Sequence, residues 1–269
     1  MRGSEFQDKV TIITGASAGI GLEMARQLSR EGAVLVLAAR EAMLLESARQ
    51  ECEGLGARAL AVPTDVSDKE QCRRLIDEAL AAFGRIDMLI NNAGISMHAR
   101  FDELRDIDAA ERIMKINYLG SVWCTWFALP HLRTTGGRIV AVSSLTGKNG
   151  VPTRTLYAAT KHAMAGFFDS LRIELRGEGV SVTVAYPGFV ATDIAQRAIA
   201  PDGGTLGERP VERTAVMSAG ECARLIIEAA RKRKREIVMT RIARFGLLAK
   251  AIVPGLVDRF AERKVRRGR

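Results

Sequence analysis

The chain has 269 residues, and 47% of them are hydrophobic, which is enough for one large buried core. The formal net charge is +9, and the positive charge gathers late, in RKRKR at 231–235 and ERKVRRGR at 262–269. Cations confined to one end of a chain are typical of solvated helix ends, so we expect no nucleic-acid function. No apolar run reaches the ~18 residues that a membrane-spanning helix needs. We expect a soluble, cytoplasmic protein.

The cysteines and histidines give no sign of a metal site. Neither set has metal-ligand spacing, and the cysteines lack the density of a disulfide framework. We therefore expect a reduced, cytoplasmic setting and no bound metal. The residues concerned are Cys52, Cys72, Cys124, Cys222, His98, His131 and His162.

The opening MRGSEF has the composition of an expression-vector scar, so residues 1–6 are left out of the fold prediction and the natural chain is taken to begin near Gln7. Short apolar runs rich in β-branched residues predict strands, and helical periodicity between them predicts helices. The predicted strands are KVTIIT (9–14), AVLVLAA (33–39), ARALAV (57–62), IDMLI (86–90), GRIVAVSS (137–144), VSVTVAY (180–186) and EIVM (236–239). The predicted helices lie near 19–31, 41–54, 67–83, 108–133, 156–177 and 218–233.

Nearly continuous apolar strands that alternate with helices are typical of a parallel sheet covered on both faces. We therefore predict an α/β fold, a three-layer, doubly wound, Rossmann-like parallel sheet of about seven strands. No linker rich in Pro, Gly or Ser divides it, and no repeat is visible. Residues 7–240 are expected to form a single domain, followed by a basic, amphipathic extension over 241–269.

A glycine-rich turn, TGASAGIG at 14–21, follows the first predicted strand and precedes a helix. Its glycines let the backbone turn tightly and approach a pyrophosphate, whose charge would face the amides at the helix start. A plain tight turn explains many isolated glycine patterns, but here the strand and the helix supply the context that a dinucleotide site requires. The expected cofactor-binding residues of this turn are Gly15, Ser17, Ala18, Gly19, Ile20 and Gly21.

The end of the second strand, VLVLAARE, indicates which dinucleotide binds. A carboxylate there would accept hydrogen bonds from the ribose of NAD, whereas the 2′-phosphate of NADP favours a cation. Ala39 stands where the acid would be, and Arg40 offers a planar guanidinium suited to phosphate. The alternative for Arg40 is an ordinary surface arginine at a strand end. We expect a preference for NADP(H), with use of NAD(H) left open.

Tyr157 and Lys161 lie four residues apart in TLYAATKHAMAGF, so on a helix they share one face. A neighbouring ammonium favours the phenolate, and we expect it to lower the tyrosine pKa, which is ordinarily about 10, toward usefulness as an acid or base. The alternative is an amphipathic helix with a snorkelling lysine.

Several other motifs accompany this pair. Ser144 ends the fifth predicted strand, thirteen residues before Tyr157. The chain also contains NNAG (91–94), Asn117 in KINYLG and YPG (186–188). Together with the glycine turn, this set resembles the short-chain dehydrogenase/reductase family from Gln7 to about Thr240. The resemblance implies an enzyme that acts on CH–OH groups with a nicotinamide dinucleotide, and Arg40 makes NADP the expected acceptor.

The resemblance also implies roles for the catalytic set. Tyr157 would exchange a proton with the substrate oxygen while hydride moves to or from the nicotinamide C4, and Lys161 would lower the tyrosine pKa and hold the nicotinamide ribose. Ser144 would stabilise the reacting oxygen; Ser143 is its less favoured neighbour, since adjacent strand residues face opposite ways. Asn117 would support a water-mediated proton relay, although the helical pattern alone places it on a solvent-facing side.

Further nucleotide contacts follow from the same resemblance. Asp65 would contact the adenine, with a helix N-cap or loop entry as its alternative role. Gly94 would allow a close approach to the ribose or simply form a turn. Many NADP-preferring relatives carry a basic residue where Ala18 stands, so Arg40 alone supports the NADP preference. The remaining implied contacts are Val66, Asn92, Ala93, Tyr157, Lys161, Pro187, Gly188, Val190 and Thr192.

Residues 193–218 lack a sustained period and are rich in Gly, Pro and Arg, which predicts a functional or mobile loop. In the resembled family a lid covers the substrate here. Arg197, Arg209 and Arg213 would contact an anionic substrate or, as the favoured alternative, be solvated loop charge. The scarcity of polar residues around Ser144 and in the tail favours an apolar ketone or alcohol, such as a steroid, a retinoid or a lipid.

Two segments bear on partners. The predicted helix over 108–133 carries Trp123, Trp126 and Phe127, which would lie in the core or at a subunit interface, and the resemblance implies a homodimer or homotetramer. In the tail, Pro254 predicts a break between two short helices. The tail would dock on its own sheet, which we rank first, roof the active site, or contact a membrane surface.

We predict an NADP(H)-dependent oxidoreductase that interconverts an alcohol and a carbonyl on a hydrophobic small molecule, with Tyr157 as the acid/base. The alternative is a catalytically silent, nucleotide-binding scaffold or sensor whose basic tail acts at a membrane surface. An intact set of Asn117, Ser144, Tyr157 and Lys161 argues against the alternative, because a binding protein has no use for an acid/base group.

Overall fold

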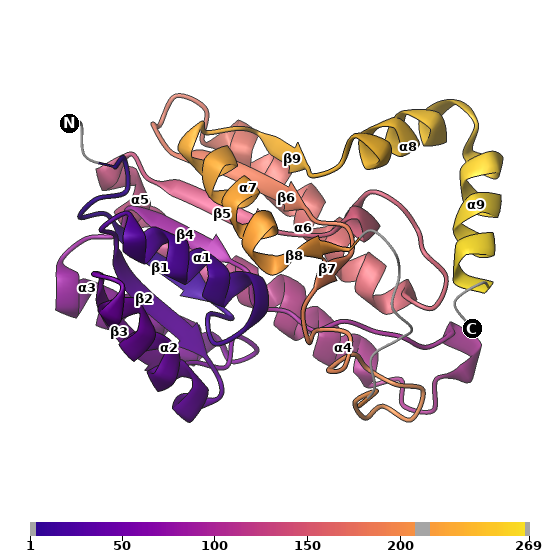
Figure 1. The fold of residues 1–269 in the computed structure, drawn as a ribbon, viewed down its shortest axis with the longest axis horizontal. Helices are drawn as coiled ribbons and strands as arrows, with labels where there is room; N and C mark the ends of the chain where they lie inside the picture. Colours follow the sequence, from indigo (N-terminus) through magenta and orange to yellow (C-terminus); the bar gives the residue numbers. More distant parts are fainter. Residues whose placement is uncertain (1–3, 208–215, 267–269) are drawn as a thin grey trace.

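The computed structural model describes residues 4–207 and 216–266 of the chain. Its central sheet is parallel, with seven strands in the order β3-β2-β1-β4-β5-β6-β9 (Figure 1). The strands are β1 Val10–Thr14, β2 Val34–Ala39, β3 Arg58–Pro63, β4 Met88–Asn91, β5 Arg138–Val142, β6 Ser181–Tyr186 and β9 Glu236–Val238. The strand order reverses between β1 and β4, and such sheets bind ligands beyond the carboxyl ends of the strands at that point.

Helices cover both faces of this sheet, so the predicted α/β fold with its three-layer, doubly wound parallel sheet is confirmed. They are α1 Gly19–Arg30, α2 Ala42–Gly54, α3 Lys69–Phe83, α4 Ala109–Met114, α5 Gly120–Thr135, α6 Thr155–Glu174 and α7 Ala219–Arg231. Successive strand residues point to opposite faces. Ile12 and Leu89 therefore join one core with α3, α5 and α6, while Ile13 and Ile90 join a second core with α1, α2 and α7.

Residues 4–6 take part in the fold, although the sequence prediction left them out. Phe6 is only 1% exposed and belongs to the core under α1 and α7. The guanidinium carbons of Arg138 and Arg231 lie 5.5 and 5.0 Å from its ring centroid, and Glu5 forms an ion pair with Arg138. This opening segment therefore packs as part of the core.

Two predicted elements differ from the structure. The single helix expected over 108–133 is interrupted by a π-helical turn, Lys115–Leu119, between α4 and α5. The loop expected over 193–218 is partly ordered: β7 (Val190–Ala191) pairs with β8 (Met217–Ser218), and Ile199 forms bridges with Met97 and Thr205. Arg197 is exposed, while Arg209 and Arg213 lie outside the described residues.

The chain continues after β9 with α8 (Arg241–Ile252) and α9 (Pro254–Arg266), which are separated at Pro254 as predicted. Figure 1 shows both helices at one end of the molecule, beyond β9. Ala243 and Leu247 pack against the core, so one side of α8 docks on the protein as expected. The other side of α8 is exposed. No helix in the described part of the chain is long and apolar enough to cross a membrane.

Candidate active site

The glycine turn after β1 has no room for a side chain at Gly15 or Gly21. Gly15 and Gly19 have φ of +66° and +56°, a region that favours glycine. A Cβ on Gly21 would lie 2.2 Å from Gly15 O, and one on Gly15 would lie 2.9 Å from Ala93 Cα. The backbone is thus folded closely on itself at the start of α1, as a pyrophosphate cradle requires. Ser17, Ala18 and Ile20 lie on the same turn, partly exposed.

Residues just after β4 form hydrogen bonds with this turn. Asn92 Nδ2 donates to Thr14 O (2.9 Å) and to Gly15 O (3.2 Å). Thr14 Oγ1 accepts from the backbone N–H groups of Asn92 and Ala93, both at 3.0 Å. The side chain of Asn92 therefore holds the glycine turn in place. The next two residues, Ala93 and Gly94, are small.

Gly94 lies against two of the predicted catalytic residues, Asn117 and Lys161. A Cβ on this residue would be 3.0 Å from Asn117 Oδ1 and 3.6 Å from Lys161 Nζ. Its φ is not among the positive values, so a left-handed turn does not explain the glycine. The missing side chain is explained by close packing against Asn117. The approach of Gly94 to a ribose stays a prediction.

Arg40 is exposed where the chain leaves β2. The glycine turn lies next to this strand end, because Ala16 N donates to Ala38 O at 3.1 Å. The ends of β1 and β2 therefore meet at the edge of the sheet where the adenosine half of a dinucleotide would lie.

Asp65 enters the loop after β3 and does not cap a helix. Its Oδ1 accepts from the backbone N–H and the hydroxyl of Ser67, at 2.9 and 2.7 Å. The N-cap of α3 is Asp68, which accepts from Glu70 N and Gln71 N. The N-cap alternative for Asp65 was wrong, and the loop-entry role is correct. Val66, the next predicted contact, is 7% exposed and its side chain belongs to the core.

The segment after β6 reaches the glycine turn from the other side. Pro187 is buried and its carbonyl accepts from Leu145 N at 2.8 Å, while Gly188 is exposed. Val190 lies in β7, and the methyl carbon of Thr192 would be 3.2 Å from a Cβ on Gly19. Two segments that are far apart in the sequence thus meet at the start of α1.

Tyr157 and Ser144 lie together at the carboxyl ends of the strands. Ser144 follows β5 and Tyr157 lies in the first turn of α6, 8% exposed. The Ser144 hydroxyl is close enough to the phenol to lower its pKa, and it accepts from Thr146 N at 3.2 Å. Ser143 turns the other way, since its hydroxyl donates to Lys161 O at 3.0 Å. The preference for Ser144 over Ser143 therefore agrees with the geometry.

The electrostatics of Tyr157 differ from the expectation. Burial raises the pKa of its phenol, while the Ser144 hydroxyl and the positive charge of Arg154 act to lower it. The shift is opposite to the one we expected from Lys161, because loss of solvation outweighs these stabilising contacts. In this arrangement the phenol is held in its protonated form at neutral pH.

Lys161 is 4% exposed and its ammonium lies 5.7 Å from the centroid of the Tyr157 ring. Nζ donates to Val142 O at 3.0 Å and lies 3.4 Å from Met164 Sδ. Burial lowers the pKa of this lysine to about 8. A buried lysine with such a pKa can gain or lose a proton near neutral pH, which suits proton transfer.

Asn117 is completely buried, so its predicted solvent-facing position was wrong. It lies in the π-helical turn, where an extra residue per turn shifts its side chain inward. Oδ1 accepts from Ile95 N at 2.8 Å, and Nδ2 donates to Ile95 O (2.9 Å) and Thr160 Oγ1 (3.0 Å). Asn117 thus ties the loop after β4 to the helix that carries Tyr157.

Arg154 also lies at this site, although it was not among the predicted site residues. Its Nη1 donates to the hydroxyl of Ser96 at 2.6 Å, and it precedes α6 by one residue. Thr153, just before it, has φ of +68°, an uncommon conformation for a β-branched residue. A cation three residues before a candidate acid/base tyrosine was the signal available in the sequence.

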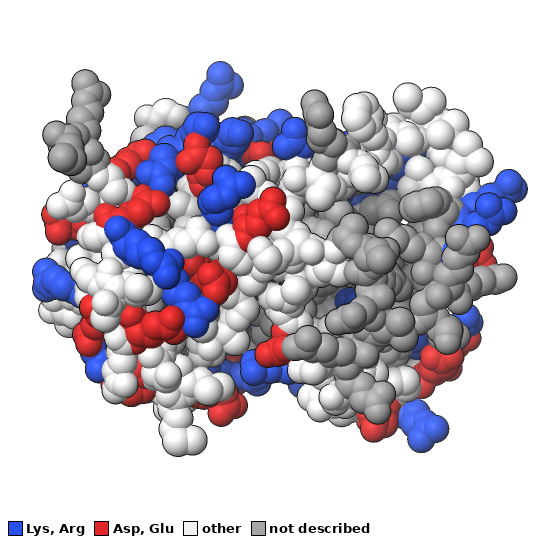
Figure 2. Space-filling model, viewed as in Figure 1, with Lys and Arg blue, Asp and Glu red and all other residues white. Residues whose placement is uncertain are grey.

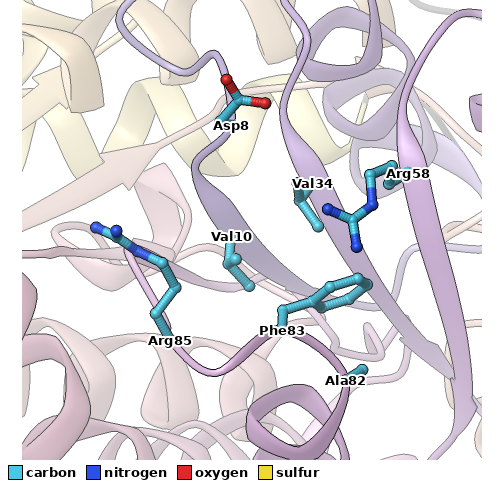
Figure 3. Close-up of a pocket in the computed structure, with 7 residues that line it drawn as sticks. All are labelled: Asp8, Val10, Val34, Arg58, Ala82, Phe83 and Arg85. Atoms are coloured by element: carbon cyan, nitrogen blue, oxygen red, sulfur yellow. The ribbon is translucent and has the colours of Figure 1, made fainter.

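A hollow elsewhere on the molecule does not include the catalytic set. Figure 3 shows its lining residues at the amino ends of β1, β2 and β3. Its volume is about 260 Å³. Its lining residues are Asp8, Val10, Val34, Arg58, Ala82, Phe83 and Arg85. Ser144, Tyr157 and Lys161 lie beyond the opposite ends of the parallel strands, so this hollow has no part in their chemistry.

Comparisons with known proteins agree with this geometry. A family model described as short chain dehydrogenase matches residues 9–202. A Pinus massoniana protein named 11-beta-hydroxysteroid dehydrogenase is 38% identical over 263 residues, which cover 95% of this chain and 74% of its own. An Arabidopsis thaliana protein named 11-beta-hydroxysteroid dehydrogenase-like 4A is 38% identical over 252 residues, 93% of this chain and 82% of its own.

Two solved structures also match over most of their length. One is a short chain dehydrogenase/reductase from Burkholderia phymatum in complex with NAD, with a TM-score of 0.83 and 26% identity over 94% of this chain and 96% of that one. The other is an alcohol dehydrogenase from the archaeon Thermococcus sibiricus complexed with 5-hydroxy-NADP, with a TM-score of 0.76 and 26% identity over 87% and 96%.

Proposed function

Because the chain belongs to the short-chain dehydrogenase/reductase family of oxidoreductases, we propose that it interconverts an alcohol and a carbonyl with NADP(H) as the electron carrier. The observation that carries the proposal is the convergence of Ser144, Tyr157 and Lys161 beside Gly94 at the carboxyl edge of the sheet. An acid/base group, an oxygen-binding hydroxyl and a nucleotide cradle are what hydride transfer to a carbonyl requires.

The residues of the glycine turn fit a dinucleotide. A Cβ at Gly15 or Gly21 would clash with neighbouring protein atoms, so only glycine keeps the tight backbone that a pyrophosphate can approach, and Thr192 lies close to Gly19. When bound, a nicotinamide would accept or supply the hydride at its C4. The part of this chain is to hold the nucleotide between the ends of β1, β4 and β6 and to handle the proton.

Tyr157 handles that proton in our proposal. Burial raises the pKa of its phenol, so at neutral pH the phenol carries the proton that it would donate to the oxygen of a bound ketone. Ser144, whose hydroxyl lies near the phenol, would donate to the same oxygen and stabilise its developing charge. In alcohol oxidation the direction reverses, and the phenolate would accept the proton.

Lys161 and Asn117 support this step. Lys161, with a pKa of about 8, is the group through which a proton would return to Tyr157 from solvent. Asn117 acts as a positioning residue, since its side chain holds both backbone groups of Ile95 and the hydroxyl of Thr160. A water-mediated relay through this region would connect Lys161 to the surface.

The NADP preference is supported by Arg40. It is exposed at the exit of β2, and Ala39 offers no carboxylate to a ribose hydroxyl. A charge-assisted hydrogen bond to a 2′-phosphate contributes about 1.5 to 3 kcal/mol, so Arg40→Ala is expected to raise the KM for NADPH at least about tenfold. The KM for NADH should stay unchanged. An unchanged KM for NADPH, or an NAD preference in the parent, would contradict this assignment.

An apolar substrate is supported by the surroundings of Tyr157. Its ring belongs to a cluster with Met97, Ile113 and Ile199. Phe189 and Ile194 nearby in the chain after β6 are 43% and 39% exposed. These side chains would contact an apolar ketone or alcohol, and the names of the plant relatives make hydroxysteroids the first class to test.

A homo-oligomer is supported by Trp126 on α5 and Ile173 on α6, which are 71% and 58% exposed. Tryptophan is enriched at subunit interfaces. We expect light scattering to give a dimer or tetramer for the parent and a smaller species for Trp126→Glu. An unchanged mass in that variant would place the interface elsewhere.

The experiment that tests the proposed activity is a panel of carbonyls and alcohols, hydroxysteroids included, read by NADPH and NADH absorbance. The proposal expects turnover on some members and none in Tyr157→Phe. A chain that binds NADPH and turns over no member would instead be the silent nucleotide-binding scaffold.

A further inference from the structure

The outer side of α8 is a row of exposed apolar side chains, which we call the α8 apolar face. It consists of Ile242, Phe245, Leu248 and Ile252, which are 85, 70, 64 and 80% exposed. Their spacing of three or four residues places them on one side of the helix. Val253 and Leu256, just after α8, are exposed as well. Met43 on α2 and Ile107 before α4 lie elsewhere on the chain, and scattered cases of that kind are normal.

The opposite side of α8 contacts the rest of the protein and so sets which way the α8 apolar face points. Ala243 and Leu247 pack against the core. Arg244 Nε donates to Val238 O at 2.9 Å, and Lys250 Nζ donates to Lys148 O at 3.2 Å. The helix is therefore held by one side, and its apolar face points away from the molecule.

The segment that carries this face has a strongly positive sequence. Residues 241–269 contain nine Lys and Arg but only two Asp and Glu, so this segment holds most of the net charge of +9. Figure 2 shows an uncharged surface where α8 lies and lysine or arginine side chains at its edge, toward α9. Arg259 and Arg263 of α9 are among the exposed cations.

We propose that the α8 apolar face and the cations of α9 form a peripheral docking surface for an anionic lipid membrane. Apolar side chains that insert among acyl chains and flanking cations that meet lipid headgroups are the two features such binding needs. A second copy of this chain fits less well, because a two-fold interface would bring two positive segments together. The inference goes beyond the proposed oxidoreductase function and does not depend on it.

The docking surface would lie near the active site. Lys250, on α8, is bonded to the carbonyl of Lys148, which follows the short 3₁₀ turn Leu145–Gly147 directly after Ser144. A protein resting on lipid by α8 would therefore hold its reaction site close to the membrane surface.

The test is sedimentation of the full-length chain with vesicles of phosphatidylcholine alone and of phosphatidylcholine mixed with phosphatidylserine, at low and high salt. We expect binding to the mixed vesicles, weaker binding to phosphatidylcholine, and loss of the difference at high salt. Phe245→Ser/Leu248→Ser should lower the partition coefficient at least about tenfold, since two large apolar side chains no longer insert. The matched control is Met43→Ser/Leu44→Ser on α2, where both residues are also exposed.

A second variant keeps the test independent of folding effects in α8. Arg259→Gln/Arg263→Gln should weaken binding to the mixed vesicles and leave binding to phosphatidylcholine unchanged. The proposal is overturned if the parent does not sediment with the mixed vesicles, or if the α2 control loses as much binding as the α8 variant. It is also overturned if the α8 variant changes only the oligomeric mass, which would make a second copy the occupant.

Discussion

The glycine turn and α8 differ in how tightly their atoms are confined. At Gly21 an added Cβ would lie 2.2 Å from a backbone oxygen, whereas at Gly246, in the middle of α8, it would meet nothing within 4 Å. The function proposed for the turn depends on the path of its backbone, which a side chain at Gly21 would displace. The function proposed for α8 depends on which side chains it exposes, and a Cβ at Gly246 would meet no other atom within 4 Å.

The largest expected effect tests this contrast directly. Gly21→Ala forces Gly15 O or Asn92 to move, so we expect a loss of about 3 kcal/mol in the free energy of unfolding, as in overpacked cores. The affinity for NADPH should fall with it. Urea unfolding and fluorescence titration with NADPH measure the two quantities.

Gly246→Ala is the matched control in α8. It should leave the unfolding free energy unchanged or raise it by less than about 1 kcal/mol, because alanine favours the helix. Equal losses in the two variants would mean that the tail is packed as tightly as the turn, and the comparison would fail.

The second effect concerns the buried lysine of the site. Burial lowers the pKa of Lys161 to about 8 from 10.5, so between these pH values the unfolded chain binds more protons than the folded one. Stability should therefore rise with pH through this window, and the charged lysine costs most below pH 8. The cost is bounded at about 3 kcal/mol by the size of the pKa difference.

Lys161→Met removes this dependence. Comparing urea unfolding of the parent and the variant, without nucleotide, below pH 8 and above pH 10 isolates the contribution of one lysine. The difference in stability between the two chains should shrink as the pH rises. A difference that is constant with pH would show that the lysine keeps its ordinary pKa in the folded protein.

The smallest expected effect concerns Arg154, whose charge acts to lower the pKa of Tyr157. In Arg154→Met that pKa should rise further, so the pH at which alcohol oxidation becomes fast moves upward by less than about one unit. Reduction at neutral pH should change little, since the phenol is already protonated. Arg197→Met, an exposed arginine in the segment after β7, serves as control. Equal shifts in both variants, or none in Arg154→Met, would remove Arg154 from the electrostatics of the site.

The sheet could be predicted from the sequence because its strands are buried on both faces. Runs such as VLVLAA need no knowledge of their neighbours to be recognised as strands. The helix interruption at Lys115–Leu119 could not, because a π-helical turn changes the direction of one side chain without changing the composition of the helix. The helical pattern therefore placed Asn117 in solvent, although it is buried. Its functional role was predicted only from the family resemblance.

The electrostatics of the site required tertiary structure. The spacing of Tyr157 and Lys161 placed both on one face of α6, but only the fold shows that burial acts on each more strongly than either acts on the other. The contact of Arg154 with Ser96 joins residues 58 positions apart. In the tail, Pro254 marked the break between two helices, whereas the side of α8 that faces solvent depends on how the helix packs.

The most direct test of the central claim measures nucleotide binding and turnover together in Tyr157→Phe. If Tyr157 acts only on the proton, NADPH should bind with a Kd close to that of the parent while turnover of the best carbonyl substrate falls by about 100-fold or more. Tyr118→Phe, a matched loss of a hydroxyl in the π-helical turn, should keep both. Turnover within tenfold of the parent in Tyr157→Phe would contradict the assignment of Tyr157 as the acid/base.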